Sequence, residues 1–205
     1  MPWFNPFDTM VHETISGSRA LFLAGDPALD FLNTRMRVNG ELVDFLQRDG
    51  DVLRWLERAG FPVARRPDRA PTSLVDAART LRESIRLLVE KRRAGRRGDP
   101  SVLNRFLVQA QSHPRLVWNK PRSPTIDRVR RQDTPAGVLG PVAEAAADLL
   151  ATADFTLVKR CEDETCVLWF SDQTKSHHRR WCSPALCGNR HKVAAYRKRR
   201  RAEGA

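Results

Sequence analysis

The sequence predicts an α+β protein, with a mainly helical N-terminal domain that includes short antiparallel strands and a small four-cysteine module that ends in a helix. Two observations support this fold class. Apolar residues recur at helical spacing over several stretches before residue 155, and all four cysteines of the 205 residues fall between positions 161 and 187. We therefore expect an N-terminal arm over residues 1–19, a helical domain over 20–155 and the cysteine module over 156–205.

The first part of the expected domain contains a turn and a short helix. The segment GDPALDFLNTR places apolar residues after a turn at 25–27, and its periodicity fits a helix or a strand. Asn39 and Gly40 stand between apolar positions and predict a tight turn that tolerates positive φ. The segment DGDVLRWLERAGF predicts an amphipathic helix with Asp51 as its N-cap and Gly60 as its end.

The clearest helix lies over TSLVDAARTLRESIRLLVEKRRAG, where apolar residues recur every three or four positions between a Thr/Ser start and Gly95. A basic loop, GRRGDP, leads to a further helix that begins at Pro100. LVWNK and IDRVRRQ are candidate strands separated by PRSP, and GPVAEAAADLLA returns to helical periodicity. FTLVKRC then predicts a strand that enters the cysteine module.

The positive charge is concentrated in the cysteine module. The chain carries a formal net charge of +12, and residues 159–201 contain 12 Lys and Arg against 4 Asp and Glu. A strongly basic protein favours a polyanionic partner, of which nucleic acid is the first choice and an anionic membrane surface the second. No apolar run is long enough for a transmembrane helix, and residues 1–14 lack the pattern of a secretory signal, so we expect a cytoplasmic protein that does not enter membranes.

The cysteine spacing is typical of a structural zinc site. Cys161 and Cys166 form one pair with four residues between them, fifteen residues follow, and Cys182 and Cys187 form a second pair with the same spacing. Two such pairs can bring four thiolates to the corners of a tetrahedron around one Zn²⁺, and an all-thiolate shell leaves no open position for catalysis. We expect a hairpin over residues 167–181 that packs Trp169, Phe170 and Trp181 around the metal.

Other uses of these residues stay open. One of the histidines at 177, 178 and 191 could replace a cysteine ligand, although four cysteines already fill the shell. An iron–sulfur cluster also takes four thiolates, but its usual spacings include a C-x2-C element that this chain lacks. A redox switch through oxidation of zinc thiolates is a third alternative.

A basic helix is expected after the last cysteine, in GNRHKVAAYRKRRR. In a helix, Val193 and Tyr196 would share one face, which we expect to pack inward on the zinc module. Arg190, next to the metal, is the best candidate for reading a base edge. The other cations suit phosphate contacts: Lys192, Arg197, Lys198, Arg199, Arg200 and Arg201. A solvated basic tail is the alternative to this interpretation.

These residues resemble a known family. WCSPALCGNR, preceded by RCEDETC, resembles the CGNR zinc finger, and LDFLNTR, followed by DFL and DVLRWLERAG, resembles the ABATE domain of the same proteins. The resemblance implies a bacterial, stress-induced transcription regulator whose finger binds DNA. It assigns the zinc ligands to the four cysteines and the signature to Gly188, Asn189 and Arg190. For that signature we expect Gly188 to adopt a φ closed to other residues and Asn189 to cap the following helix.

Asp30, Asn33 and Arg35 are the candidate ligand-sensing residues of the N-terminal domain. They lie close together among apolar residues, so they either satisfy local backbone groups, which is the favoured interpretation, or line a pocket for a small molecule. The sequence contains no G-x-S-x-G, phosphate loop or H-E-x-x-H, and no cysteine outside the metal site, so we expect no enzymatic activity.

The sequence thus favours a zinc-containing protein that docks a basic helix on double-stranded DNA. A single finger contacts few base pairs, so specificity requires a homodimer or a second contact such as the basic loop at 95–98. The alternative is an RNA-binding or ribosome-associated zinc-knuckle protein in which aromatic residues, Tyr196 among them, stack on unpaired bases. A third class is a protein-interaction module whose tail only provides solubility.

Overall fold

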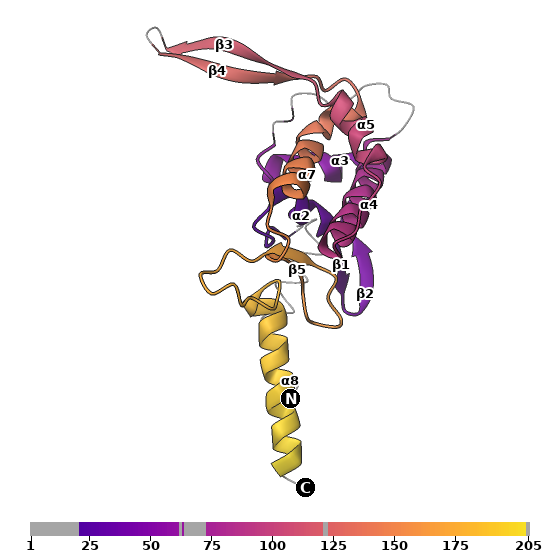
Figure 1. The fold of residues 1–205 in the computed structure, drawn as a ribbon, viewed down its shortest axis with the longest axis vertical. Helices are drawn as coiled ribbons and strands as arrows, with labels where there is room; N and C mark the ends of the chain where they lie inside the picture. The colour runs from indigo at the N-terminus through magenta and orange to yellow at the C-terminus, as the bar shows by residue number, and fades with distance from the viewer. Residues whose placement is uncertain (1–20, 62, 64–72, 121–122, 204–205) are drawn as a thin grey trace. The chain divides into compact units, whose positions relative to one another are not determined.

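The structure, a computed structural model, describes residues 21–61, 63, 73–120 and 123–203 (Figure 1). The chain forms two compact units. One combines the described residues of Met1–Phe45 with those of Ala153–Ala205, and the other is Leu46–Thr152. The first unit therefore contains both ends of the described chain, whereas the sequence placed residues 20–155 together. The expected arm over residues 1–19 lies outside the described residues.

The unit Leu46–Thr152 is a helical bundle around one long helix. Its helices are α3 (Asp49–Arg58), α4 (Leu74–Arg93), α5 (Ser101–Gln109), α6 (Pro135–Val138) and α7 (Gly140–Thr152). Helix α4 packs against each of the other four. Its residues Leu81, Ile85 and Val89 are fully buried, as their helical spacing predicts. The helices expected around 51–60, 73–94, 100–110 and 140–151 are confirmed.

Polar side chains define where these helices begin. The hydroxyl of Ser73 accepts a hydrogen bond from the backbone N–H of Asp76 at 3.2 Å and caps α4. The prediction that Asp51 is the N-cap of α3 is wrong, because α3 begins two residues earlier. Asp51 instead reaches back from the first turn, and its Oδ2 accepts the N–H groups of Gln47 and Arg48 at 2.9 Å each. A carboxylate in the first turn satisfies free N–H groups as a cap would.

A long hairpin extends from this helical bundle. Strands β3 (Ser112–Lys120) and β4 (Ser123–Arg130) pair antiparallel, and both are longer than the strands expected from LVWNK and IDRVRRQ. At the base of the hairpin, Arg130 makes a 2.7 Å ion pair with Glu144 of α7. The hairpin then leads away from the helices (Figure 1).

The discontinuous unit is built from short elements. Its N-terminal part contains α2 (Pro27–Leu32), β1 (Arg35–Val38) and β2 (Glu41–Asp44), and its C-terminal part contains β5 (Val158–Arg160), β6 (Trp169–Ser171), a single π-helical turn η1 (Pro184–Gly188) and α8 (Asn189–Glu203). Asn39 and Gly40 join β1 to β2 with φ values of 51° and 86°, which confirms the predicted tight turn.

The hairpin expected over residues 167–181 is wrong. Strand β6 pairs antiparallel with β5, so that Phe170 stands opposite Lys159, and the residues after Ser171 form a loop. In this position Trp169 and Phe170 are buried, with exposed fractions of 6% and 0%. The two aromatic residues therefore belong to the core of the unit.

Asn33 connects the two ends of the described chain. Its Nδ2 donates to the carbonyl of Trp169 at 2.8 Å, and its Oδ1 accepts the N–H of Trp169 at 2.9 Å, although 136 positions separate the two residues. The side-chain amide thus provides the donor and the acceptor that a neighbouring strand would provide. Nearby, the N–H of Ser171 donates to the carbonyl of Ala24 at 2.7 Å. Helix α2 packs on β6, and Phe31 and Phe170 are fully buried.

Every helix among the described residues is too short or too polar to cross a membrane.

We expect Asn33→Ala to destabilise the discontinuous unit by about 2–4 kcal/mol, because both backbone groups of Trp169 would stay buried without a partner. Urea denaturation of the zinc-loaded protein, followed by tryptophan fluorescence, measures this change in the free energy of unfolding. The exposed Asn104→Ala on α5 is the matched control and should change stability by no more than about 0.5 kcal/mol. Equal stability of the two variants would contradict the role given to Asn33.

Candidate metal centre and basic helix

The four cysteine sulfur atoms come together at one point, all within 4.8 Å of one another. The Sγ of Cys182 lies 3.8 Å from that of Cys166 and 3.6 Å from that of Cys187. A tetrahedral ion with Zn–S bonds of about 2.3 Å has S···S edges of about 3.8 Å, so the donors fit one Zn²⁺. A disulfide would require an S–S distance of about 2.05 Å. The four cysteines therefore form a structural zinc site.

Short loops hold each cysteine in place. The N–H of Cys161, just after β5, donates to the carbonyl of Leu168 at 2.9 Å, and the N–H of Cys166 donates to the carbonyl of Asp163 at 2.8 Å. The N–H of Cys182 points at the sulfur of Cys161 from 3.4 Å, as a backbone donor to a thiolate does. Cys187 lies within η1 and is buried.

The electrostatics of the cluster suit a divalent cation. Hydrogen bonds from Cys166, Cys182 and Cys187 lower the pKa of Cys161. Bonds to Cys161 and Cys166 raise the pKa of Cys182 and of Cys187, because these thiols donate their protons within the cluster. Four thiolates in this volume would repel one another, and a divalent cation removes the repulsion as it displaces the protons.

The histidines have other surroundings. The Nδ1 of His177 lies 3.3 Å from the carbonyl of Asp172, and the Nε2 of His191 lies 3.7 Å from Asp163. Among the described residues, the ligand group at this point consists of the four cysteines. The distances between the cysteine sulfur atoms suit a single ion, and they give no support to the alternatives of a histidine ligand or an iron–sulfur cluster.

Two expectations for the signature residues are wrong. The φ of Gly188 is not positive, and its N–H donates to the carbonyl of Ser183 at 3.0 Å, which closes the π-helical turn. A Cβ at this position would meet only ordinary contacts of 3.6 Å or more. The side chain that caps the helical run belongs to Ser183, whose Oγ accepts the N–H of Leu186 at 3.3 Å, and Asn189 already lies inside that run.

Arg190 connects the start of α8 to the first cysteine pair. Its Nη1 donates to Oγ1 of Thr165 at 2.7 Å and to Oδ2 of Asp163 at 3.2 Å. Asp163 is buried, and its Oδ1 accepts the N–H and the hydroxyl of Thr165 at 2.9 and 2.6 Å. Arg190 therefore braces the Cys161–Cys166 loop against the helix that follows Cys187. The role of Arg190 in reading a base stays a prediction.

The rest of α8 projects from the zinc module (Figure 1), and its described side chains from Arg190 onward are exposed. The cations Lys192, Arg197, Arg199 and Arg200 are exposed, and the side chains of Lys198 and Arg201 lie outside the described residues. The prediction that Val193 and Tyr196 pack inward is wrong, because they are 39% and 56% exposed. Among the described residues, none covers these two side chains more closely, because α8 extends past the small module.

Asp30 and Asn33 serve internal contacts. The Oδ1 of Asp30 accepts the N–H groups of Leu23 and Ala24 at 2.9 Å each, and burial raises its pKa although these bonds lower it. Asn33 bonds Trp169 as described above, and Arg35 is exposed on β1. These contacts agree with the local interpretation, and ligand sensing by the three residues stays a prediction.

Asp172 organises the loop between the cysteine pairs and was missed from the sequence. Its fully buried carboxylate accepts hydrogen bonds from Nζ of Lys159 at 2.7 Å, from the N–H of Arg179 at 2.8 Å and from the hydroxyl of Thr174 at 2.6 Å. Burial alone would raise the pKa of Asp172, but these bonds hold it well below its ordinary value. The guanidinium of Arg179 in turn lies over the ring of Phe170, 4.3 Å from its centroid.

A repeated signal could have revealed these loop residues. Asp-x-Thr occurs at 154–156, 163–165 and 172–174, and in each case the aspartate accepts the N–H and the hydroxyl of the threonine two positions later. Such aspartates are typical of tight loop turns. Two of the three turns lie in the zinc module.

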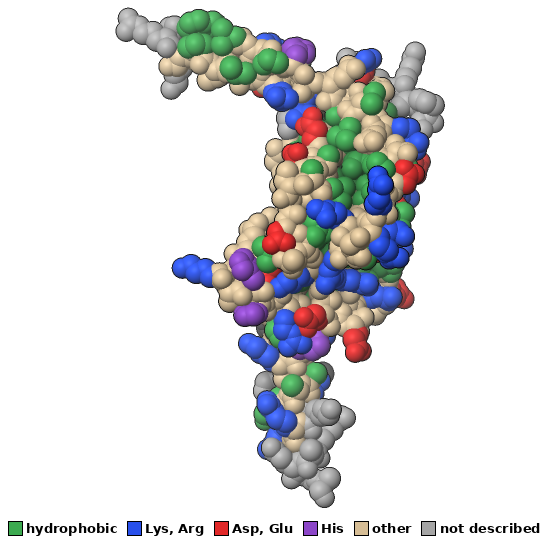
Figure 2. All heavy atoms as spheres, viewed as in Figure 1, with side chains coloured by type: hydrophobic (Ala, Val, Ile, Leu, Met, Phe, Trp, Pro, Cys, Tyr) green, Lys and Arg blue, Asp and Glu red, His purple; other side chains and the backbone are tan. Residues whose placement is uncertain are grey.

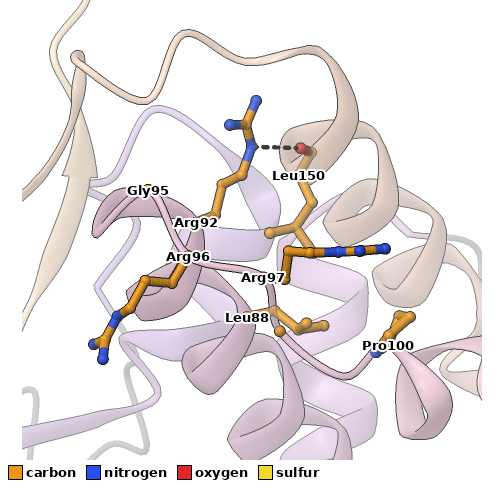
Figure 3. Close-up of a pocket in the computed structure, with 8 residues that line it drawn as sticks. Leu88, Arg92, Gly95, Arg96, Arg97, Pro100 and Leu150 are labelled. Atoms are coloured by element: carbon orange, nitrogen blue, oxygen red, sulfur yellow. Dashed lines mark hydrogen bonds between the residues drawn. The ribbon is translucent and has the colours of Figure 1, made fainter.

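The basic loop after α4 borders a shallow hollow in the unit Leu46–Thr152 (Figure 3). The hollow has a volume of about 390 Å³ and is lined by Arg92, Arg96 and Arg97 together with Leu88 and Leu150. The Nε of Arg92 donates to the carbonyl of Leu150 at 3.4 Å. The loop expected at 95–98 as a second nucleic-acid contact thus presents two further arginines beside an apolar floor.

The fold and the site define a zinc-binding protein whose four-cysteine finger ends in a basic helix. The ABATE family model, described as "Putative stress-induced transcription regulator", matches residues 25–153, and the CGNR zinc finger model matches residues 158–200. The chain belongs to the ABATE family and carries a CGNR zinc finger, as the resemblance in its sequence indicated. Comparison with curated proteins gave no significant match.

We expect Arg190→Ala to weaken zinc binding about 10-fold, because the contacts to Asp163 and Thr165 that support the first cysteine loop are lost. Competition with a chromophoric chelator measures the affinity. Arg197→Ala, on the same helix but exposed, is the matched control and should leave zinc affinity unchanged. Unchanged zinc affinity in Arg190→Ala would assign Arg190 to external contacts instead.

We expect Asp172→Asn to lower the free energy of unfolding by about 2 kcal/mol at pH 7, because Lys159 loses its charged partner. A depressed folded-state pKa contributes stability that is fully present above the ordinary value near 3.9 and lost only as the pH falls through the lower value. The difference between the wild type and Asp172→Asn should therefore stay constant from about pH 8 to pH 5. A difference that shrinks in this range, measured by urea denaturation at saturating zinc, would contradict the depressed pKa.

Proposed function

We propose that the zinc-loaded protein binds double-stranded DNA through α8 and regulates transcription in the bacterial cytoplasm under stress. The observation that carries the proposal is a 15-residue helix that is joined directly to the metal site and exposes cations along its length. Such a helix is about 22 Å long, and the major groove, about 12 Å wide, admits an α-helix. The family description supports a regulatory role.

The cations of α8 serve as phosphate contacts in this proposal. Lys192, Arg197, Arg199 and Arg200 are exposed, and no acidic side chain is present on α8 before Glu203. Each neutralised phosphate releases counterions, so about four contacts would give a slope of about −3.6 in a plot of log affinity against log salt. Zinc contributes structure in this scheme, because a filled thiolate shell leaves no open position for substrate. We therefore expect no catalysis.

Burial of two aromatic side chains of the zinc module favours DNA over single-stranded RNA as the partner. Stacking on unpaired bases requires exposed aromatic faces, whereas Trp169 and Phe170 are buried in the core of their unit. Tyr196, which is 56% exposed, and the half-buried Trp181 are the remaining aromatic residues of the module. RNA binding is thus an outcome that the experiment must separate from DNA binding.

Selection from sheared genomic DNA by the zinc-loaded protein, at about 150 mM salt, tests the proposal. We expect a few upstream regions to be retained, and an excess of single-stranded RNA should not compete. The double variant Arg197→Ala/Arg199→Ala should lose this retention while it keeps its zinc. Arg54→Ala/Arg86→Ala removes the same charge from α3 and α4 and should keep it.

Two outcomes would contradict the proposal. Uniform recovery of all fragments would mean that α8 binds DNA only nonspecifically through its charge. Competition by RNA would favour the RNA-binding alternative.

A further inference from the structure

The hairpin β3–β4 presents a strongly apolar face to solvent. In the antiparallel register Leu116 stands opposite Ile126 and Trp118 opposite Pro124, and alternation places these four side chains on the same face. Leu116, Trp118 and Ile126 are 62%, 62% and 76% exposed. The opposite face carries the ion pair of Arg115 and Asp127, with 3.1 Å between Nη2 and Oδ2. Figure 2 shows hydrophobic side chains gathered on this hairpin.

An ion pair fixes the base of the hairpin to the helices. Arg130 pairs with Glu144 of α7 at 2.7 Å, while the 2.8 Å hydrogen bond from Nη1 of Arg128 to Oγ of Ser112 joins the two strands. In the part of the chain that the structure describes, neither strand packs extensively against an element other than its own partner. A two-stranded sheet alone is marginally stable in water, and contiguous exposed apolar surface marks an interaction site. The apolar face is therefore suited to contact with another surface.

The same unit offers a matching surface on α5. A hollow of about 370 Å³ is lined by Phe106, Val108 and Ala136, with Arg105 and Gln109 at its side. Val108 is 67% exposed, although it lies on a helix whose inner residues, Leu103 and Phe106, are buried. An apolar hollow beside an exposed valine is complementary to a face that carries Trp118, Leu116 and Ile126.

We infer that the hairpin is an exchanged arm, which lays its apolar face on α5 of a second copy of this chain. The hairpin leads away from its own helices, so it covers a neighbour more readily than itself (Figure 1). Each chain has one arm and one receiving surface. In a closed two-fold dimer, the arm of each chain covers the receiving surface of the other chain. This inference goes beyond the proposed function and does not depend on DNA binding.

The available area is sufficient for a dimer. A strand of nine residues at about 3.4 Å per residue is about 30 Å long, and two strands are about 10 Å wide, so one face covers about 300 Å². Each arm and the surface below it would bury about 600 Å², and two arms about 1,200 Å², which reaches the lower limit of specific interfaces. An interface of this size, with a tryptophan and two branched aliphatic residues at its centre, fits a dissociation constant on the order of 1 µM.

Sedimentation velocity of the zinc-loaded full chain tests the inference across a concentration series. We expect a species of twice the 23.3 kDa chain mass that dissociates on dilution. Ile126→Glu on the arm and Val108→Glu on α5 should each weaken dimerisation by at least about tenfold, because each places a charge in the apolar contact. Arg115→Gln, on the opposite face of the hairpin, is the matched control and should leave the dimer unchanged.

Val108→Glu also guards against a folding defect, because it changes an exposed helix position outside the strands, and its circular dichroism and melting temperature should equal those of the wild type. A wild type that stays monomeric at about 100-fold above the expected dissociation constant would overturn the inference. A dimer that resists both glutamate variants would overturn it as well. Neither result is itself a test of DNA binding, which retention of genomic fragments measures separately.

Discussion

Mutual repulsion of four buried thiolates is the constraint on which the zinc module depends. The sulfur atoms lie within 4.8 Å of one another, and such a group is stable only around a cation. The module itself has little core, since β5 and β6 are three residues each, so the free energy of metal binding must hold its loops together. Polar contacts fix the segments around the metal site. Asp163 accepts a hydrogen bond from Arg190 at the start of α8. Asp172 accepts hydrogen bonds from Lys159 and Arg179 in the loop between the cysteine pairs.

The zinc module also forms one compact unit with residues from the N-terminal part of the chain. The ABATE match ends at residue 153 and the finger match begins at 158, yet the compact unit joins residues up to Phe45 with those from Ala153 onward. The Asn33 amide and the α2–β6 packing close this unit, so the N-terminal part of the ABATE match contributes core to the finger. Residues 21–45 therefore belong to the same compact unit as α8.

Much of this architecture could be predicted from the sequence, and the failures have a common physical origin. Cysteine spacing and helical periodicity are local, so the metal ligands and α4 were predicted well. The pairing of β6 with β5 and the contact of Asn33 with Trp169 are decided by packing between distant segments, for which the sequence contains no local signal. Gly188 was misjudged because glycine suits a turn with positive φ, whereas here it lies in a helical turn. Val193 and Tyr196 were expected inside because apolar residues usually are, but in the described part of the chain α8 extends beyond the zinc module and leaves them exposed.

Amide hydrogen exchange of the zinc-loaded and zinc-stripped protein tests most directly whether one metal ion holds both ends of the described chain in a single unit. The account predicts that zinc removal abolishes protection in α2 and in the β1–β2 hairpin as well as around the cysteines, while α4 and α7 keep theirs. Loss of protection confined to residues 158–203 would contradict it, because the N-terminal segment would then be ordered without the metal.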